Sequence, residues 1–289
     1  MKINVAKSAG FCFGVRRALK IALGASQSGT RVEMLGDIVH NEEVVSELHK
    51  AGIKKIACLR KGQQKTLLIR AHGASGETFR RALCLGYRIV DATCPMVKEI
   101  HKIARKAEEE GYVIIIIGDK RHDEVRGIIG QLKKRALVIE DSQDIPLSTI
   151  GRIDKAAVVV QSTQNLEKAL TIVNILKHDI RELKFFNTIC KPTRIKQAEI
   201  KEMPLHNEVM IIIGSKTSAN TKRLYEISIS RNERSYWIQN SKELNPRWFK
   251  GVKSVGIMAG ASTPDYTTES VIERIRALSL EAGSVTSQI

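Results

Sequence analysis

The chain has 289 residues, of which 43% are apolar and 6 are proline, so it can bury a large core and is not typical of a disordered protein. Its formal net charge of +16 predicts anionic partners, such as a phosphorylated substrate, a nucleic acid or an acidic protein. The first residues contain no apolar signal region, and no run approaches the roughly 18 apolar residues that span a membrane. We therefore expect a cytoplasmic protein without a membrane partner.

Short apolar runs alternate with amphipathic patterns along the chain. Nine runs are predicted as strands, and they cover residues 3–6, 31–36, 66–71, 87–93, 112–118, 156–161, 183–189, 209–214 and 254–260. Amphipathic patterns such as residues 95–110 and 267–278 predict helices between them. This alternation indicates an α/β fold with mostly parallel sheets that are covered on both faces. The charged stretches 177–184 and 194–203 are interpreted as solvated helix faces.

The spacing of cysteine and glycine reveals an internal repeat. Cys12, Cys94 and Cys190 each follow a predicted strand and precede a predicted helix, and 24 residues after each cysteine a glycine ends another strand. Four and six residues beyond these glycines lie polar side chains, namely His40 and Glu42, His122 and Glu124, and Ser218 and Asn220. The repeat predicts three similar α/β units arranged as a pseudo-threefold trefoil, with boundaries at residues 13–93, 94–189, and 190–289 plus 1–12.

A later strand in each unit also ends in small or polar residues. These are His72 in the first unit, Ser162 and Thr163 in the second, and Ser262 in the third. In open α/β sheets, ligands bind beyond the carboxyl ends of strands, where helix N-termini present N–H groups. Packing around a common axis would therefore bring these side chains and the three cysteines to one cavity.

The five cysteines are typical neither of a secreted disulfide framework nor of a paired zinc motif. Cys58 and Cys84 lack the strand-to-helix setting and are interpreted as small apolar core residues, which is the ordinary role of a single cysteine. Three thiolates in equivalent positions indicate metal ligands instead. Zinc is one alternative, and a four-iron cluster with one iron left for substrate is the other.

Eight motifs occur in order between residues 10 and 265: GFCFGV, VHN, AHG, DATCP, HDEV, NTIC, GSKTSAN and AGASTPD. Together they resemble the 4-hydroxy-3-methylbut-2-enyl diphosphate reductase family, which ends the non-mevalonate isoprenoid pathway. The resemblance implies a trefoil around one 4Fe-4S cluster bound by Cys12, Cys94 and Cys190. It also implies a two-electron reductive dehydroxylation that yields isopentenyl and dimethylallyl diphosphate, with ferredoxin or flavodoxin as electron donor.

The resemblance also implies roles for the repeated polar residues. The expected diphosphate ligands are His40, His72, His122, Ser218, Asn220 and Ser262, and a nearby phosphate favours charged histidine. Ser162 and Thr163 are expected to position the leaving hydroxyl, and Glu124 to donate its proton. Glu42 is expected only to stabilise a helix N-terminus. The remaining histidines, which are His49, His101, His178 and His206, are expected on the surface.

Four features depart from the usual pattern of the family. Ser162 stands in place of a threonine, Ala219 in place of a serine, and Asp123 in place of a proline. The stretch KPTRIKQ after Cys190 lacks the usual small residue before its threonine and has KQ in place of RQ. Asp123 adds a negative charge near the expected diphosphate site. None of these changes removes a cluster ligand or the acid, so we expect the same reaction.

Two other functions fit part of the sequence. A non-catalytic basic protein that binds phosphate or RNA would explain the charge without the cysteines, although the 2 Trp, 5 Tyr and 6 Phe do not interleave with basic clusters. Nucleic acid is therefore not expected as a partner. A zinc-bound structural trefoil would explain the cysteines but would give Glu124 no role.

Overall fold

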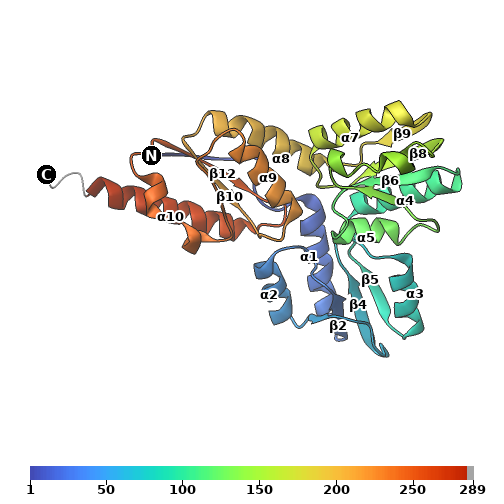
Figure 1. The fold of residues 1–289 in the computed structure, drawn as a ribbon. Helices are drawn as coiled ribbons and strands as arrows, with labels where there is room; N and C mark the ends of the chain where they lie inside the picture. Colours follow the sequence, from blue (N-terminus) through green and yellow to red (C-terminus); the bar gives the residue numbers. More distant parts are fainter. Residues whose placement is uncertain (285–289) are drawn as a thin grey trace. The chain divides into compact units, whose positions relative to one another are not determined.

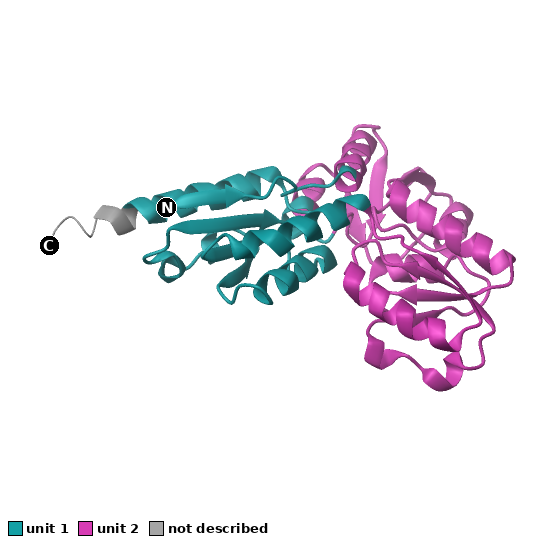
Figure 2. Ribbon diagram, turned by 90° about the horizontal axis from the view of Figure 1, so that it is seen from above, with its two compact units in different colours: residues 1–13, 40–44, 191–289 teal, residues 14–39, 45–190 magenta. Residues whose placement is uncertain are grey.

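The computed structural model describes residues 1–284, which fall into two compact units (Figure 2). Unit 1 comprises residues 1–13, residues 40–44 and the chain from Lys191 onward. Unit 2 comprises residues 14–39 and 45–190. Unit 1 contains one four-stranded sheet and unit 2 contains two, and all paired strands in the described chain are parallel.

The first sheet of unit 2 follows the N-terminal helix of the chain. Its strands are β2 (Arg31–Leu35), β3 (Lys54–Ile56), β4 (Lys65–Ile69) and β5 (Arg88–Asp91), and its order is β3-β2-β4-β5. The helices of this part of the sequence are α1 (Phe13–Ser26), α2 (Glu42–Lys50) and α3 (Gly76–Cys84). Buried Leu67 and Ile69 of β4 pack in one apolar cluster with Ala82 of α3, which holds that helix against the sheet.

The second sheet of unit 2 has the order β7-β6-β8-β9, with strands β6 (Val113–Ile117), β7 (Leu137–Ile139), β8 (Lys155–Val160) and β9 (Glu182–Phe186). Its helices are α4 (Pro95–Glu109), α5 (Asp123–Ile129), α6 (Leu147–Ile150) and α7 (Leu166–Asp179). Ile115 and Ile117 belong to the core on the α7 side, whereas Ile116 packs with α4 and α5. Because both faces are covered (Figure 1), the run in β6 is apolar throughout.

The sheet of unit 1 has the order β11-β10-β12-β1. Its strands are β1 (Lys2–Val5), β10 (Val209–Ile213), β11 (Ser235–Ile238) and β12 (Ser254–Ala259), and its helices are α8 (Lys191–Glu202), α9 (Ala219–Ile229) and α10 (Asp265–Ser284). Ile211 belongs to the core that includes α10, and Ile212 to the core that includes α8 and α9. The N-terminal strand β1 thus completes a sheet made otherwise by the last third of the chain.

The three sheets share one strand order, in which the strand that ends in the repeated glycine lies second. The N–H groups of Gly36, Gly118 and Gly214 donate to the carbonyls that end the edge strands β3, β7 and β11, over 3.4, 3.0 and 2.9 Å. The predicted α/β class with three units of parallel strands is confirmed, as are all nine predicted strands. The strands β3, β7 and β11 were not predicted.

The interpretation of the charged stretch 194–203 as a solvated helix face is wrong. In the stretch 194–203, Lys196, Gln197 and Ile200 of α8 are buried, with Lys196 only 2% exposed. In the stretch 177–184 the charged residues are exposed as expected, although the helix ends at Asp179 and β9 begins at Glu182. The sequence does not distinguish an exposed lysine from a buried one whose ammonium group donates to backbone carbonyls, so the charge pattern was misleading. Within residues 1–284, no helix is both long and apolar enough to cross a bilayer.

Candidate active site

A buried carboxylate in unit 2 lies at the carboxyl end of β8. Glu124, the second residue of α5, is 1% exposed, and Ser162 follows the end of β8 by two residues. The N–H of Ser162 donates to Oε1 of Glu124 and its hydroxyl donates to Oε2, both over 2.6 Å. Burying a carboxylate is costly unless such hydrogen bonds compensate. The two hydrogen bonds therefore hold Glu124, the expected proton donor, next to Ser162, which is expected to position the leaving hydroxyl.

His122 is the N-cap of α5 and adjoins this carboxylate along the chain. Its Nδ1 accepts a hydrogen bond from the N–H of Glu124 over 3.1 Å. A ring nitrogen that accepts carries no proton, so Nε2 bears the hydrogen of the neutral ring. Protonation of Nδ1 would break the cap. The cap thus leaves Nε2 as the ring nitrogen whose hydrogen is available to an acceptor, and the charged form expected beside a phosphate stays a prediction.

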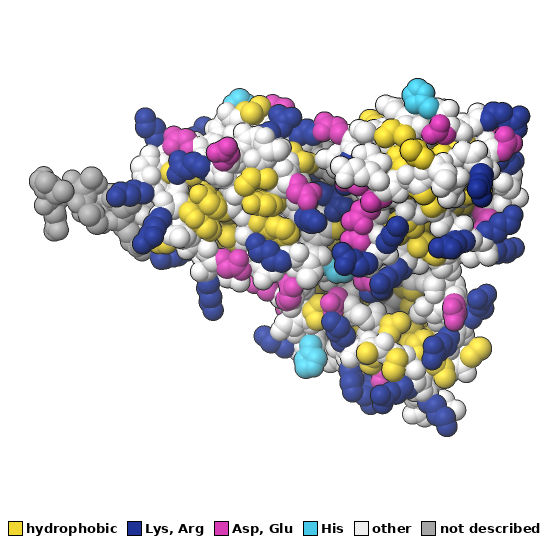
Figure 3. All heavy atoms as spheres, in the orientation of Figure 1, with side chains coloured by type: hydrophobic (Ala, Val, Ile, Leu, Met, Phe, Trp, Pro, Cys, Tyr) yellow, Lys and Arg dark blue, Asp and Glu magenta, His cyan; other side chains and the backbone are white. Residues whose placement is uncertain are grey.

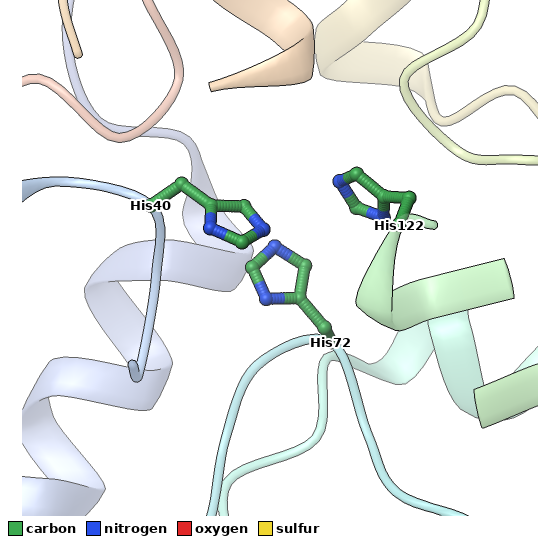
Figure 4. Close-up of side chains that lie close together, drawn as sticks. All are labelled: His40, His72 and His122. Carbon is green, nitrogen blue, oxygen red and sulfur yellow. The ribbon is translucent and has the colours of Figure 1, made fainter. Parts of the chain in front are cut away.

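A second imidazole of unit 2 lies against His122. The rings of His72 and His122 meet edge to face, with centroids 5.3 Å apart and an interplanar angle of 88° (Figure 4). A ring nitrogen of one lies within 4.8 Å of a ring nitrogen of the other. His72 belongs to the loop that follows β4, and His122 to the start of α5. Two N–H groups at this separation suit neighbouring oxygens of one anion.

Thr163 is oriented differently from its neighbour Ser162. Its Oγ1 accepts from Nε2 of Gln161 over 3.0 Å, and Oε1 of Gln161 accepts from the N–H of Asp119 over 3.0 Å. These bonds join the loop after β8 to the loop after β6. Of the two predicted hydroxyls, Ser162 is the one that the structure places on Glu124.

In unit 1, two predicted ligands lie at the N-terminus of α9. Ser218 is the N-cap, and its Oγ accepts from the N–H of Thr221 over 3.3 Å. Asn220 is 5% exposed, and its amide nitrogen has no hydrogen-bond partner among the described residues. A buried donor without an acceptor costs about 1–3 kcal/mol. The amide of Asn220 therefore indicates an acceptor supplied by a ligand.

His40 and Ser262 are also joined within unit 1. The hydroxyl of Ser262 donates to the backbone carbonyl of His40 over 3.2 Å. The next residue, Asn41, caps α2 by accepting from the N–H of Val44, and Glu42 accepts from the hydroxyl of Ser215, each over 3.0 Å. Ser262 thus anchors the short segment that carries His40, and Glu42 has a tertiary contact besides the expected place in the first turn of a helix.

The three repeated cysteines occupy equivalent backbone positions. The N–H groups of Cys12, Cys94 and Cys190 donate to carbonyls two residues beyond the ends of β12, β4 and β8, over 3.1, 2.9 and 3.0 Å. Each cysteine directly precedes a helix, and each is intermediate in exposure. Cys58 and Cys84 are exposed, so their interpretation as core residues is wrong. Among the described residues, neither of these two cysteines makes the backbone hydrogen bond that the repeated cysteines make beyond a strand end.

One histidine that sequence reasoning placed on the surface is buried. His101 of α4 is 6% exposed, whereas His49, His178 and His206 are exposed as expected. Burial, and secondly the positive charge of Arg105, lower the pKa of His101 from 6.5 to about 4. The signal was present in the helical spacing, because Val97 and Ala104 place position 101 on the buried face of α4.

Comparison with known proteins finds relatives over nearly the whole chain. A family model described as LytB protein matches residues 3–276. The 4-hydroxy-3-methylbut-2-enyl diphosphate reductase of Aquifex aeolicus is 39% identical over 280 residues, which are 96% of each chain. That of Geotalea daltonii is 37% identical over 279 residues, covering 96% of this chain and 98% of the relative.

Two solved structures are similar in fold as well. One is described as (E)-4-hydroxy-3-methyl-but-2-enyl diphosphate reductase, the terminal enzyme of the non-mevalonate pathway, with a TM-score of 0.71, 39% identity, and coverage of 96% of this chain and 100% of the other. The reductase of Plasmodium falciparum has a TM-score of 0.87, 26% identity, and coverage of 94% and 87%. The chain therefore belongs to the LytB protein family, whose relatives are 4-hydroxy-3-methylbut-2-enyl diphosphate reductases.

Proposed function

We propose that this chain reduces 4-hydroxy-3-methylbut-2-enyl diphosphate to isopentenyl and dimethylallyl diphosphate in the cytoplasm. The substrate takes up two electrons and two protons, its C–O bond to the hydroxyl breaks, and one water leaves. The observation that carries the proposal is the buried Glu124 carboxylate, held on both oxygens by Ser162 and flanked by His122. A family relationship names the reaction class, and this arrangement supplies the proton chemistry that the reaction needs.

The Glu124 and Ser162 pair provides a path for a proton. With Oε2 protonated, Glu124 donates to Oγ of Ser162 across the same 2.6 Å, and the hydroxyl of Ser162 then turns its own hydrogen toward the leaving oxygen. The N–H of Ser162 keeps Oε1 in place during this exchange. Thr163 supports the strand-end loop through Gln161. The proton is thus delivered from a side chain that bulk water does not reach.

The proposed donors for the diphosphate are imidazoles, a hydroxyl and a buried amide. His72 and His122 offer the paired imidazoles, with the hydrogen of His122 on Nε2 because of its capping role. Ser218 and Asn220 offer a hydroxyl and a buried amide at the N-terminus of α9, where the helix dipole favours an anion. His40 completes the set, and Ser262 anchors its segment.

The cysteine positions fit an iron–sulfur cluster. The three cysteines have the same surroundings, as equivalent thiolate ligands would. Each makes the same type of backbone hydrogen bond, lies between a strand and a helix and is partly exposed, and they are Cys12, Cys94 and Cys190. A 4Fe-4S cluster, when bound, supplies the reducing electrons and leaves one iron without a protein ligand. We propose that these three residues hold it, one cluster per chain, and that ferredoxin or flavodoxin delivers the electrons.

The proposal is tested by anaerobic purification, iron and sulfide quantification, and turnover of the substrate with reduced methyl viologen. We expect about four iron and four sulfide per chain in the wild type. Cys12→Ser, Cys94→Ser and Cys190→Ser should each lose cluster and turnover, whereas Cys84→Ser, a change at an exposed thiol, should keep both. Full cluster content in the three variants would refute the ligand assignment. Zinc without sulfide would favour a structural trefoil, and RNA binding without iron would favour a basic binding protein.

Glu124→Gln separates the acid from the cluster. This variant keeps the shape of the side chain but cannot cycle a carboxyl proton, so we expect normal iron content and substrate binding with kcat lowered by about 10²–10⁴-fold. Asp144→Asn, at an exposed capping carboxylate in the same unit, serves as control. Near-normal turnover of Glu124→Gln would remove Glu124 from the proton path.

A further inference from the structure

An ion pair joins the two loops of unit 2 that carry the paired imidazoles. Nη1 of Arg70, just beyond the end of β4, lies 2.6 Å from Oδ2 of Asp123, the first residue of α5. The two side chains are only 20% and 22% exposed. The pair of Arg181 and Asp154 in the same unit has the same length but is 78% and 66% exposed. The weak screening by water makes the Arg70–Asp123 pair the more consequential of the two.

The positions of both partners connect the pair to the site. Arg70 lies two residues before His72, and Asp123 lies between His122 and Glu124. Arg70 is also packed against the end of β2, because a Cβ atom added to Gly36 would lie 2.5 Å from its Nη1. Gly36 has a φ of +79°, which itself favours glycine. The guanidinium thus lies where the end of β2, the end of β4 and the start of α5 meet.

Asp123 needs a partner for two reasons. A carboxylate one residue from His122 repels the oxygens of a bound diphosphate unless its charge is neutralised. The first position of a helix is also where proline is favoured, since its ring fixes φ near −65° and the absent N–H costs nothing there. Aspartate supplies no such backbone restraint, so the restraint at this position comes from its side chain.

We propose that the Arg70–Asp123 ion pair positions His122 and Glu124 relative to His72, and that it neutralises Asp123 next to the diphosphate. In this proposal Arg70 and Asp123 act through His72, His122 and Glu124, and are therefore positioning residues. The proposal rests on the proposed function for its effect on turnover. Its effect on anion binding is independent of turnover.

The test compares Arg70→Met with Asp123→Asn in the cluster-loaded enzyme, measuring kcat, KM and calorimetric binding of inorganic pyrophosphate. Arg70→Met removes the positive charge next to Asp123 and makes the site more negative, so we expect pyrophosphate binding about tenfold weaker and a lower kcat. Asp123→Asn leaves an unpaired cation instead, so kcat falls while pyrophosphate binding is not weakened. A merely structural role would lower both quantities alike in both variants.

A rescue and a control complete the experiment. Arg70→Met combined with Asp123→Pro removes both charges and restrains the first turn of α5 through the backbone, so it should recover most of the kcat lost in Arg70→Met. Arg181→Met, which breaks the exposed pair, should match the wild type. If Arg70→Met alone does not fold, the kcat of the double variant is compared with that of Asp123→Asn instead. The double variant should then be the faster of the two, because it has no unpaired cation.

The outcomes separate this proposal from the proposed function. Wild-type values of kcat and pyrophosphate affinity in Arg70→Met overturn the positioning role. A double variant as slow as Arg70→Met shows that Arg70 acts other than through Asp123, which also overturns it. A wild type that binds no pyrophosphate and reduces no substrate refutes the proposed function itself.

Discussion

Ser162 shows how much of a site can survive a change of side chain. Relative to the threonine usual in the family it lacks a methyl group, which restricts the rotamer of a β-branched residue. The structure supplies that restriction in another way, because both the N–H and the hydroxyl of Ser162 bond to Glu124. Its hydroxyl is therefore oriented by the carboxylate, and the acid is held by the serine in return.

The buried imidazole of His101 predicts an acid-sensitive fold. Its pKa is lowered from 6.5 to about 4 by burial, so between these values the unfolded chain binds a proton that the folded chain does not. The free energy of unfolding must then fall as the pH is lowered through this window, by about 2 kcal/mol between pH 7 and pH 5. Anaerobic urea unfolding at both pH values measures it.

The matched variants for this prediction are His101→Gln and His178→Gln. His178 is exposed on α7, so His178→Gln should keep the full pH dependence, whereas His101→Gln should lose the share that belongs to the buried imidazole. If the free energy of unfolding of His101→Gln depended on pH as steeply as that of the wild type, the buried imidazole would not be the source of the acid sensitivity.

At the level of single residues, the repeat correctly placed three polar side chains at helix N-termini, whereas their roles as proton donor and diphosphate ligands stay predictions. Glu124, Ser218 and Asn220 were found by equal spacing, and each lies at the start of a helix. Sequence reasoning failed for His101 and Lys196, which are polar side chains on the buried faces of amphipathic helices. Only tertiary packing shows which face is buried. The residues of the Arg70–Asp123 pair are far apart in sequence, and no local pattern connects them.

Helix α8 is the element that holds the loop before Cys12. Nζ of Lys196 donates to the carbonyls of Ser8, Gly10 and Ala259, the last two over 3.0 and 3.1 Å. One turn further, Glu199 accepts from the N–H of Ser8 over 3.0 Å and from its hydroxyl over 2.6 Å. Burial would raise the pKa of Glu199, but the hydrogen bonds from Ser8 and Lys7 and the charge of Lys196 lower it overall.

Removing the ammonium group should loosen this loop. Lys196→Met removes the ammonium donor from three backbone carbonyls and the positive charge next to Glu199, so we expect the free energy of unfolding to fall by about 3 kcal/mol. Lys196→Arg retains the charge and donors, and should lose less. Lys222→Met on α9, whose side chain is 62% exposed, is the control. Equal stability of Lys196→Met and the control would mean that the three bonds contribute nothing.

The edge strands show the limit of local patterns for whole elements. The strands β3, β7 and β11 have three or four residues each, too few for a periodic signal, and all three occupy the same place in their sheets. They form because the neighbouring strands β2, β6 and β10 present a parallel edge. Central strands such as β6 and β10 were predictable because burial on both faces makes them apolar throughout.

For the whole molecule, the repeat predicted three sheets of the same kind, and the described chain has them in the same strand order. The predicted boundaries at residues 13–93, 94–189 and 190–289 plus 1–12, and the packing of these units around one axis, stay predictions. Compactness divides the chain differently, into two units, with the first two sheets together in unit 2. A repeated spacing in the sequence predicts that segments have the same local structure, but it does not predict how these segments pack against each other.

The charge of the whole molecule bears on the proposed electron donor. Lys and Arg outnumber Asp and Glu by 47 to 31, and Figure 3 shows their side chains spread widely over the face that it draws. Such a surface attracts an acidic protein at long range, and salt screens this attraction. The bimolecular rate constant for reduction by ferredoxin or flavodoxin should therefore fall by about tenfold or more as salt rises from low to high concentration.

Stopped-flow reduction of the cluster at several salt concentrations measures this dependence, with reduced methyl viologen as the matched reductant. Because methyl viologen is a small cation, a basic surface does not attract it, and its rate constant should stay level or rise as salt screens the repulsion. A protein donor whose rate is equally insensitive to salt would mean that the positive surface has no part in its approach. A general effect of salt on the cluster would change the rate constants of both reductants in the same direction. An effect of the surface charge would lower the rate constant of an acidic protein donor and leave that of methyl viologen level or raise it.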